Sequence, residues 1–114
     1  MIIIHGVNSL PPPLPRYLTS EVVQALATFP VVVLTGARQT GKSTLIRELL
    51  PASGRDYRTL DDIDVLERAQ REPDSLVSSK GPLTIDEIQR SPDLLLAIKR
   101  AVDRERKPGR FLLS

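Results

Sequence analysis

The chain of 114 residues carries 16 Lys and Arg against 14 Asp and Glu, a formal net charge of +2, and 40% of its residues are hydrophobic. This length has room for one domain with one modest core. The absence of cysteine and the single histidine, His5, exclude disulfides, thiolate zinc sites, cysteine nucleophiles and a metal site built from histidines. No apolar run approaches the ~18 residues that span a bilayer, and no signal-peptide pattern opens the chain. We therefore expect a cytoplasmic protein that does not associate with membranes.

The first 15 residues are expected to form a proline-rich leader. Pro11, Pro12, Pro13 and Pro15 disfavour a helix interior or a central strand, so the segment is expected to be extended and polyproline-like. A stiff linker is favoured over a ligand of an SH3-type domain.

Residues 19–28 show a helical pattern that Pro30 ends. The apolar residues expected on one face of this helix are Val22, Val23, Leu26 and Phe29. The following β-branched run, Val31–Leu34, suits a strand buried on both faces, as in a parallel sheet.

Two helices and a strand are predicted next. Residues 42–50 form a helix that Pro51 stops, and a second strand lies near residues 57–60. Asp61 is expected to cap a helix over residues 62–72. The core-facing residues predicted for that helix are Ile63, Leu66 and Ala69.

The last third of the chain continues the alternation of strands and helices. Leu83–Asp86 is a short strand that ends on a carboxylate, and Ser91 is the expected N-cap of the next helix, with Pro92 at its first position. The apolar stripe predicted for this helix comprises Leu94, Leu95, Ile98, Ala101 and Val102. A fourth strand follows over Phe111–Leu113. The alternation predicts an α/β fold with a parallel sheet, right-handed crossovers and helices on both faces.

Positive charge is concentrated over residues 99–110. The basic residues there are Lys99, Arg100, Arg104, Arg106, Lys107 and Arg110. Contact with nucleic acid stays open, but a solvated helix face is favoured because no aromatic residue interleaves these charges.

The segment after the first buried strand matches the P-loop spacing without a mismatch. Its glycines let backbone N–H groups point at phosphate oxygens, and the following helix adds its positive dipole end. Lys42 is predicted to reach the β- and γ-phosphates, and the Ser43 hydroxyl to bind Mg²⁺. The predicted nucleotide-binding residues are Gly36, Ala37, Arg38, Gln39, Thr40, Gly41, Lys42, Ser43 and Thr44.

A second motif, Asp86-Glu87, ends the third predicted strand. In this place Asp86 would hold Mg²⁺ directly or through water, and Glu87 would orient and deprotonate the attacking water. The alternative is that both residues cap the turn before Gln89. A Glu directly after the Asp favours water as the nucleophile, and hence hydrolysis of ATP. For Gln89 and Arg90, surface placement is favoured over contact with the γ-phosphate.

Four segments together resemble the prokaryotic AAA-type ATPases of the AAA_14 group. They are residues 31–43, 60–62, 85–92 and 102–113, and the resemblance runs from about Arg16 to the last residue. The resemblance implies ATP and Mg²⁺ as ligands. It assigns the family's P-loop lysine, hydroxyl, metal-binding Asp and catalytic Glu to Lys42, Ser43, Asp86 and Glu87. Residues 16–114 are then expected to form the N-terminal part of a P-loop ATPase domain.

The family pattern goes on, after the fourth strand, to a sensor residue and a fifth strand beside the P-loop strand. The resemblance therefore implies an incomplete AAA-type core, with weak or absent hydrolysis by this chain. Without a fifth strand, one edge of Val31–Leu34 would pair with another chain, in a homo-oligomer or with a partner, or aggregate. The run Ile2–Ile4 is the candidate within the chain for covering this edge.

Two other functions stay open from the sequence. One is a nucleotide-binding interaction module, or a remnant, that does not hydrolyse ATP. The other is a phosphotransferase, which would need an acceptor-binding segment after the third strand, and the capped helix there offers none. ATP is preferred over GTP on the resemblance, because no base-reading motif of GTPases is found.

Overall fold

Five parallel strands form one sheet in the computed structural model, which describes residues 2–4, 16–35, 54–78 and 80–114. The strands are β1 (Ile2–Ile4), β2 (Val31–Leu34), β3 (Asp56–Thr59), β4 (Leu83–Asp86) and β5 (Phe111–Leu113). Their order across the sheet is β1-β2-β5-β4-β3, and every neighbouring pair is parallel. All strands therefore end at the same edge of the sheet.

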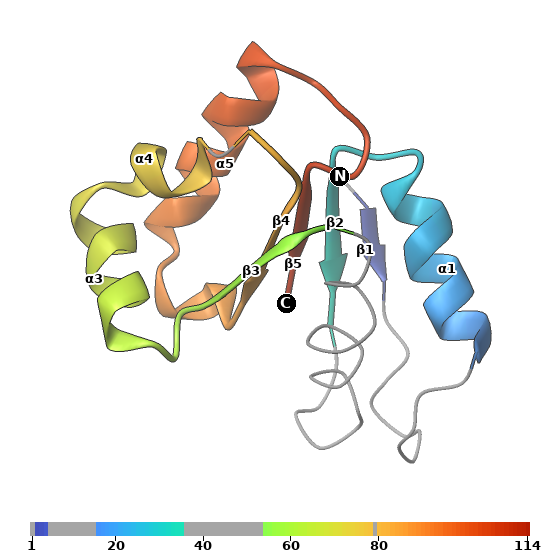
Figure 1. The fold of residues 1–114 in the computed structure, drawn as a ribbon, viewed down its shortest axis with the longest axis horizontal. Helices are drawn as coiled ribbons and strands as arrows, with labels where there is room; N and C mark the ends of the chain where they lie inside the picture. The colour runs from blue at the N-terminus through green and yellow to red at the C-terminus, as the bar shows by residue number, and fades with distance from the viewer. Residues whose placement is uncertain (1, 5–15, 36–53, 79) are drawn as a thin grey trace.

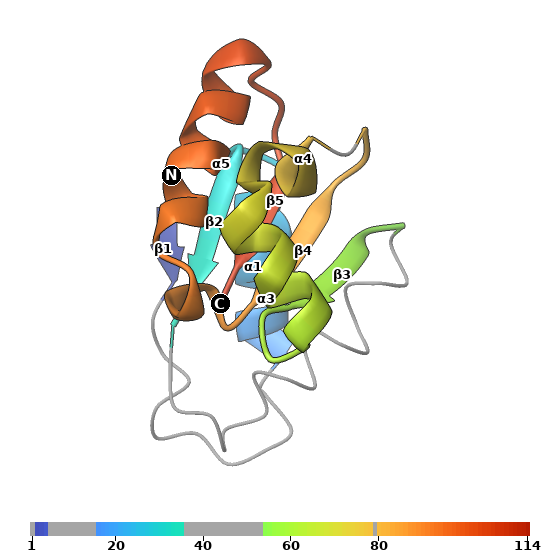
Figure 2. The same ribbon diagram turned by 90° about the vertical axis from the view of Figure 1, so that its left-hand side faces the viewer.

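Helices cover both faces of this sheet (Figure 1). Helix α1 (Arg16–Leu26) lies on one face. On the other lie α3 (Ile63–Arg71), α4 (Pro73–Val77) and α5 (Asp93–Arg104), as the turned view also shows (Figure 2). The predicted α/β fold is confirmed. None of the helices in these described ranges is long and apolar enough to cross a membrane.

Strand β1 covers the edge of β2, as proposed for the isoleucine run. Ile2 pairs with Val32, and Ile4 pairs with Leu34. The N–H of Thr35 donates to the carbonyl of Ile4 at 2.9 Å, which carries the pairing one residue beyond β2. The strand that leads into the P-loop segment is therefore hydrogen-bonded on both sides.

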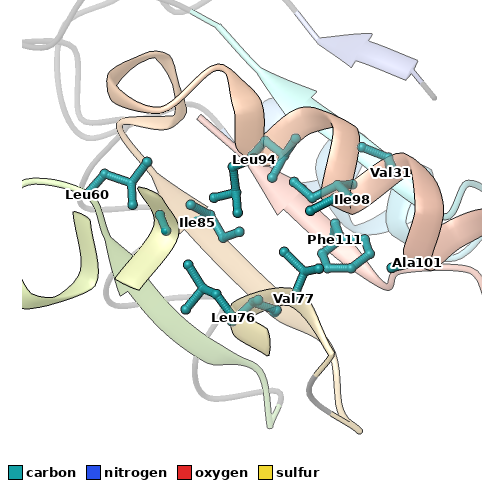
Figure 3. Packing of buried hydrophobic residues seen from close by; sticks show 13 residues of the cluster. Val31, Leu60, Leu76, Val77, Ile85, Leu94, Ile98, Ala101 and Phe111 are labelled. Carbon is teal, nitrogen blue, oxygen red and sulfur yellow. The ribbon is translucent and has the colours of Figure 1, made fainter. Parts of the chain in front are cut away.

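Two apolar clusters lie on opposite faces of the sheet, because successive residues of a strand point to opposite sides. Val31 belongs to the cluster under α3, α4 and α5, and Val32 to the cluster under α1. Phe111, at the start of β5, lies in the first cluster close to Val77 and Ala101 (Figure 3). The buried members of the second cluster are Ile4, Val22, Ala25, Val32, Leu34 and Leu112.

The predicted helix faces are partly wrong. Val23 is 53% exposed and Ile63 is 76% exposed, so neither residue belongs to the core. The cap of α3 is Asp62, whose side chain accepts from the N–H of Asp64 at 2.9 Å, and not Asp61. With the helix starting at Ile63, this residue lies at its exposed end, which explains why it does not pack inward.

Helix α5 differs from the prediction in two details. Its cap position is occupied by Pro92, one residue after the predicted Ser91. The carbonyl of Ser91 accepts from the N–H of Leu94 at 3.0 Å. Ala97 is fully buried in this helix, whereas Leu95 is 46% exposed. The short α4 was not predicted, because its apolar residues are too few to show a helical period.

A buried arginine holds the opposite, amino-terminal end of the strands. The guanidinium of Arg55 donates to the carbonyls of Gly109 (2.5 Å) and Leu83 (2.9 Å) and to the hydroxyl of Thr84 (3.0 Å). Burial lowers the pKa of Arg55 to about 10, so the group stays charged at neutral pH. Gly109 has φ of 73° and its Cα lies close to the carbonyl of Leu26, where a Cβ would meet that oxygen at 2.7 Å. Glycine is therefore required at this turn.

Candidate functional site

The carboxyl edge of the sheet brings the acidic pair to the same side as the start of the P-loop segment. Val33 pairs with Leu113, which pairs with Ile85. One residue further along, Leu34, Ser114 and Asp86 follow in one row. Because neighbouring strands lie 4.7–4.9 Å apart, β4 and β2 are separated by about 10 Å across β5. Ligands of open α/β sheets bind beyond this edge.

Asp86 is the last residue of β4 and is only 3% exposed. Its Oδ2 accepts from the hydroxyl of Tyr57 at 3.0 Å. Its Oδ1 accepts from the hydroxyl of Ser114 at 2.6 Å and from the N–H of Glu87 at 2.9 Å. A buried carboxylate needs such partners, and these three donors hold it in one orientation.

Glu87 turns the chain sharply after the strand. Its backbone lies in the left-handed region, with φ of 60° and ψ of 42°, and it is 8% exposed. A non-glycine residue in this region stores about 1 kcal/mol or more of strain, and such residues cluster at functional sites. The N–H of Ile88 donates to the carbonyl of Ser114 at 2.8 Å, so β5 supports the turn.

Gln89 and Arg90 have contacts that the sequence did not reveal. The side-chain amide of Gln89 donates to Oε2 of Glu87. Arg90 forms an ion pair with Asp61 at 2.9 Å, which joins the short 3-10 helix η3 (Ile88–Arg90) to the turn after β3. Both side chains of this ion pair are 47% exposed, so it contributes at most about 1 kcal/mol.

Tyr57 was not among the predicted site residues, and neither was Ser114, the other hydroxyl donor to Asp86. Tyr57 lies on β3 opposite Thr84, and Asp86 is two residues further along β4 on the same face. Such diagonal neighbours are within reach of an aromatic side chain. The alternation of residues along a strand could have suggested that Tyr57 and Asp86 share a face of the sheet. This inference needs the pairing register of β3 and β4, which the sequence does not provide.

The predicted nucleotide-binding segment lies outside the described residues. This holds for Gly36, Ala37, Arg38, Gln39, Thr40, Gly41, Lys42, Ser43 and Thr44. Thr35, directly before it, is described and is held by its N–H and its hydroxyl on the carbonyl of Ile4, at 2.9 and 3.3 Å. The chain is thus fixed at the point where the segment begins.

The acidic residue at this edge fits Mg²⁺ that is bound together with a nucleotide. Across the described ranges there is no group of three or more His, Cys, Asp and Glu residues that would hold a metal ion. Mg²⁺ is usually held by one or two carboxylates together with phosphate oxygens and water. One hydrogen-bonded carboxylate, Asp86, at the edge where the P-loop segment begins fits that mode of binding.

The family comparison agrees with this geometry. The family model described as an AAA domain, AAA_14, matches residues 28–114, and the chain therefore belongs to this family. Membership implies P-loop nucleotide binding. The resemblance noted from the sequence is confirmed.

Two mycobacterial proteins are similar in sequence. They are the uncharacterized protein Mb2031c of Mycobacterium bovis and the uncharacterized protein Rv2008c of Mycobacterium tuberculosis. Each is 40% identical over 100 residues, which is 86% of this chain and 22% of the relative. The chain thus spans about a fifth of the length of these relatives. No solved structure gives a significant match.

Proposed function

We propose that this chain binds ATP through residues 36–44 and that the complete protein hydrolyses ATP. The observation that carries this proposal is the position of Asp86 and Glu87. They lie at the carboxyl edge of the sheet, two strands from the strand that enters the P-loop segment. Family membership supports the nucleotide, and the adjacent Glu87 supports water as the nucleophile.

In this proposal each residue has a separate role. Lys42 neutralises charge on the β- and γ-phosphates, and backbone N–H groups of residues 36–44 bind phosphate oxygens. Ser43 and Asp86 would hold Mg²⁺, which when bound neutralises negative charge on the phosphates. Glu87 orients a water molecule and accepts its proton. Its distance from Asp86 is fixed because the two are adjacent in the chain.

The first test is binding of Mg·ATP, measured by calorimetry on the purified chain with GTP as competitor. We expect Lys42→Ala to weaken binding about 100-fold, equivalent to about 2.7 kcal/mol, because a charge-assisted contact to phosphate is lost. Lys99→Ala, which removes the same charge from the exposed face of α5, is the matched control and should bind as the unaltered chain does. Equal binding by the two variants would contradict a P-loop role for Lys42.

The second test separates binding from hydrolysis. In a protein extended to the length of the relatives, Glu87→Gln should leave Mg·ATP affinity within about threefold and lower kcat by about 100-fold or more, because the amide accepts no proton. Phosphate release is the measurement. Unchanged kcat in Glu87→Gln would exclude Glu87 as the general base.

One contact favours a second candidate, a nucleotide-binding interaction module that does not hydrolyse ATP. The amide of Gln89 occupies Oε2 of the Glu87 carboxylate, and a carboxylate held in this way is less free to accept a proton from water. This candidate predicts nucleotide binding with no phosphate release at any concentration of ATP, and no effect of Glu87→Gln.

A further inference from the structure

A column of polar side chains runs along the α1 face of the sheet, inside an otherwise apolar layer. From the amino ends of the strands it begins with Arg55 and Thr84, which are joined by a hydrogen bond of 3.0 Å. It continues through Tyr57, whose side chain also packs against the apolar cluster under α1. It ends at the carboxyl edge with Asp86 and Ser114. The column connects the interior of the sheet to the candidate site.

The hydrogen bonds on Asp86 are divided unequally between its two oxygens. An ionised carboxylate has about four lone-pair positions, two on each oxygen. Among the described residues, Ser114 and the N–H of Glu87 both donate to Oδ1, whereas Tyr57 alone donates to Oδ2. The remaining acceptor position is therefore on Oδ2, the oxygen that Tyr57 holds.

We infer that Tyr57 is a positioning residue for Mg²⁺ binding, which fixes the Asp86 carboxylate so that Oδ2 is directed to the metal or to a metal-bound water. The inference rests on the proposed role of Asp86. Tyr57 does not touch the metal or the nucleotide in this account; it acts through Asp86. Partners of this kind, which hold a ligand by hydrogen bond, affect metal affinity by about 10- to 100-fold.

The position of Tyr57 supports this role over one of packing alone. Residue 57 stands opposite Thr84, so the phenol reaches diagonally along the sheet to Asp86 with its ring in the apolar cluster. A phenylalanine would keep that ring packing and lose only the hydroxyl. The difference between the two residues is therefore confined to the hydroxyl, which donates the hydrogen bond to Oδ2.

The experiment compares Tyr57→Phe with Ser114→Ala, which removes the other hydroxyl donor from the same carboxylate. ATP affinity is measured by calorimetry over a series of Mg²⁺ concentrations and again in EDTA, well below the unfolding midpoint of each variant. We expect Tyr57→Phe to lower the gain in ATP affinity that Mg²⁺ provides by about 10-fold. The ATP affinity in EDTA should be unchanged. Ser114→Ala should stay within about threefold in both conditions, because the N–H of Glu87 remains on Oδ1.

Three results would overturn the inference. They are an unchanged Mg²⁺ dependence in Tyr57→Phe, an equal loss with and without Mg²⁺, and an equal effect of Ser114→Ala. An equal loss of ATP affinity in both conditions would assign Tyr57 a structural role. The unfolding midpoint of Tyr57→Phe without nucleotide would then also be lowered. Lys42→Ala is measured in the same series, so that a failure of the proposed nucleotide site can be distinguished from a failure of the role of Tyr57. If the unaltered chain and Lys42→Ala bind ATP alike, or neither binds, the nucleotide site itself is refuted and the role of Tyr57 with it.

Discussion

Ile4→Asp is expected to lower the free energy of unfolding by about 4 kcal/mol or more and to make the chain aggregate. Ile4 is 3% exposed and packs with Val32 and Leu34 of the strand it pairs with. The substitution loses about 2–3 kcal/mol of apolar burial and places a carboxylate in an apolar cluster, where its burial is unfavourable. When β1 detaches, the apolar β2 presents an unpaired edge, which is a site for association between chains.

Ile3→Asp is the matched control for this prediction. Ile3 occupies the neighbouring position of the same strand but is 47% exposed, since alternate residues of a strand face opposite sides. Its variant should lose about 1 kcal/mol or less and associate no more than the unaltered chain does. The measurements are denaturant unfolding and light scattering. Equal stability of the two variants would show that β1 does not dock on β2 in solution.

Phe111→Ala is the second large effect, with an expected loss of about 3–5 kcal/mol in the free energy of unfolding. Phe111 is 1% exposed and fills the cluster between the sheet and α5 (Figure 3). It also begins β5, which pairs with both β2 and β4. A cavity at this point therefore loosens the strand that separates the P-loop strand from Asp86. The loss is a large fraction of the total stability, because native domains are stable by only about 5–15 kcal/mol.

The control for the core variant is Leu96→Ala, which removes a large apolar side chain that is 59% exposed on α5. It should cost less than about 1 kcal/mol, because little area is buried there. Urea unfolding of both variants gives the comparison. Mg·ATP binding by Phe111→Ala should be recovered at low temperature, where the folded fraction is high; a loss of binding by folded protein would indicate a direct role for β5 in the site.

Several parts of the fold follow from the sequence because they depend on neighbours along the chain. The β-branched run Val31–Leu34 and the strand Leu83–Asp86 lie where the pattern places them. The alternation of strands and helices sufficed for the parallel sheet with helices on both faces. The P-loop spacing and the acidic pair are local motifs, so they could be read without any knowledge of the pairing of strands.

Other features depend on residues that are distant in the chain, and only the tertiary structure decided them. Helix periodicity placed Val23 and Leu95 on apolar helix faces and Ile63 in the core, and all three are exposed. Which turns of a helix meet the sheet depends on how the helix docks. The left-handed backbone of Glu87 is not predicted by local propensity, because non-glycine residues rarely have a positive φ. The turn is supported by a hydrogen bond from Ile88 to Ser114, which is distant in the chain.

The site shows the same division. Sequence alone identified a segment with the P-loop spacing and an acidic pair, because each motif consists of consecutive residues. The sequence offered Ile2–Ile4 as a candidate to cover β2, but the register of that pairing depends on residues separated by tens of positions. The contact of Tyr57 with Asp86 depends in the same way on the register of β3 and β4. Register is set by the total burial of both faces of the sheet, a property of the assembled fold that no single stretch of the chain contains.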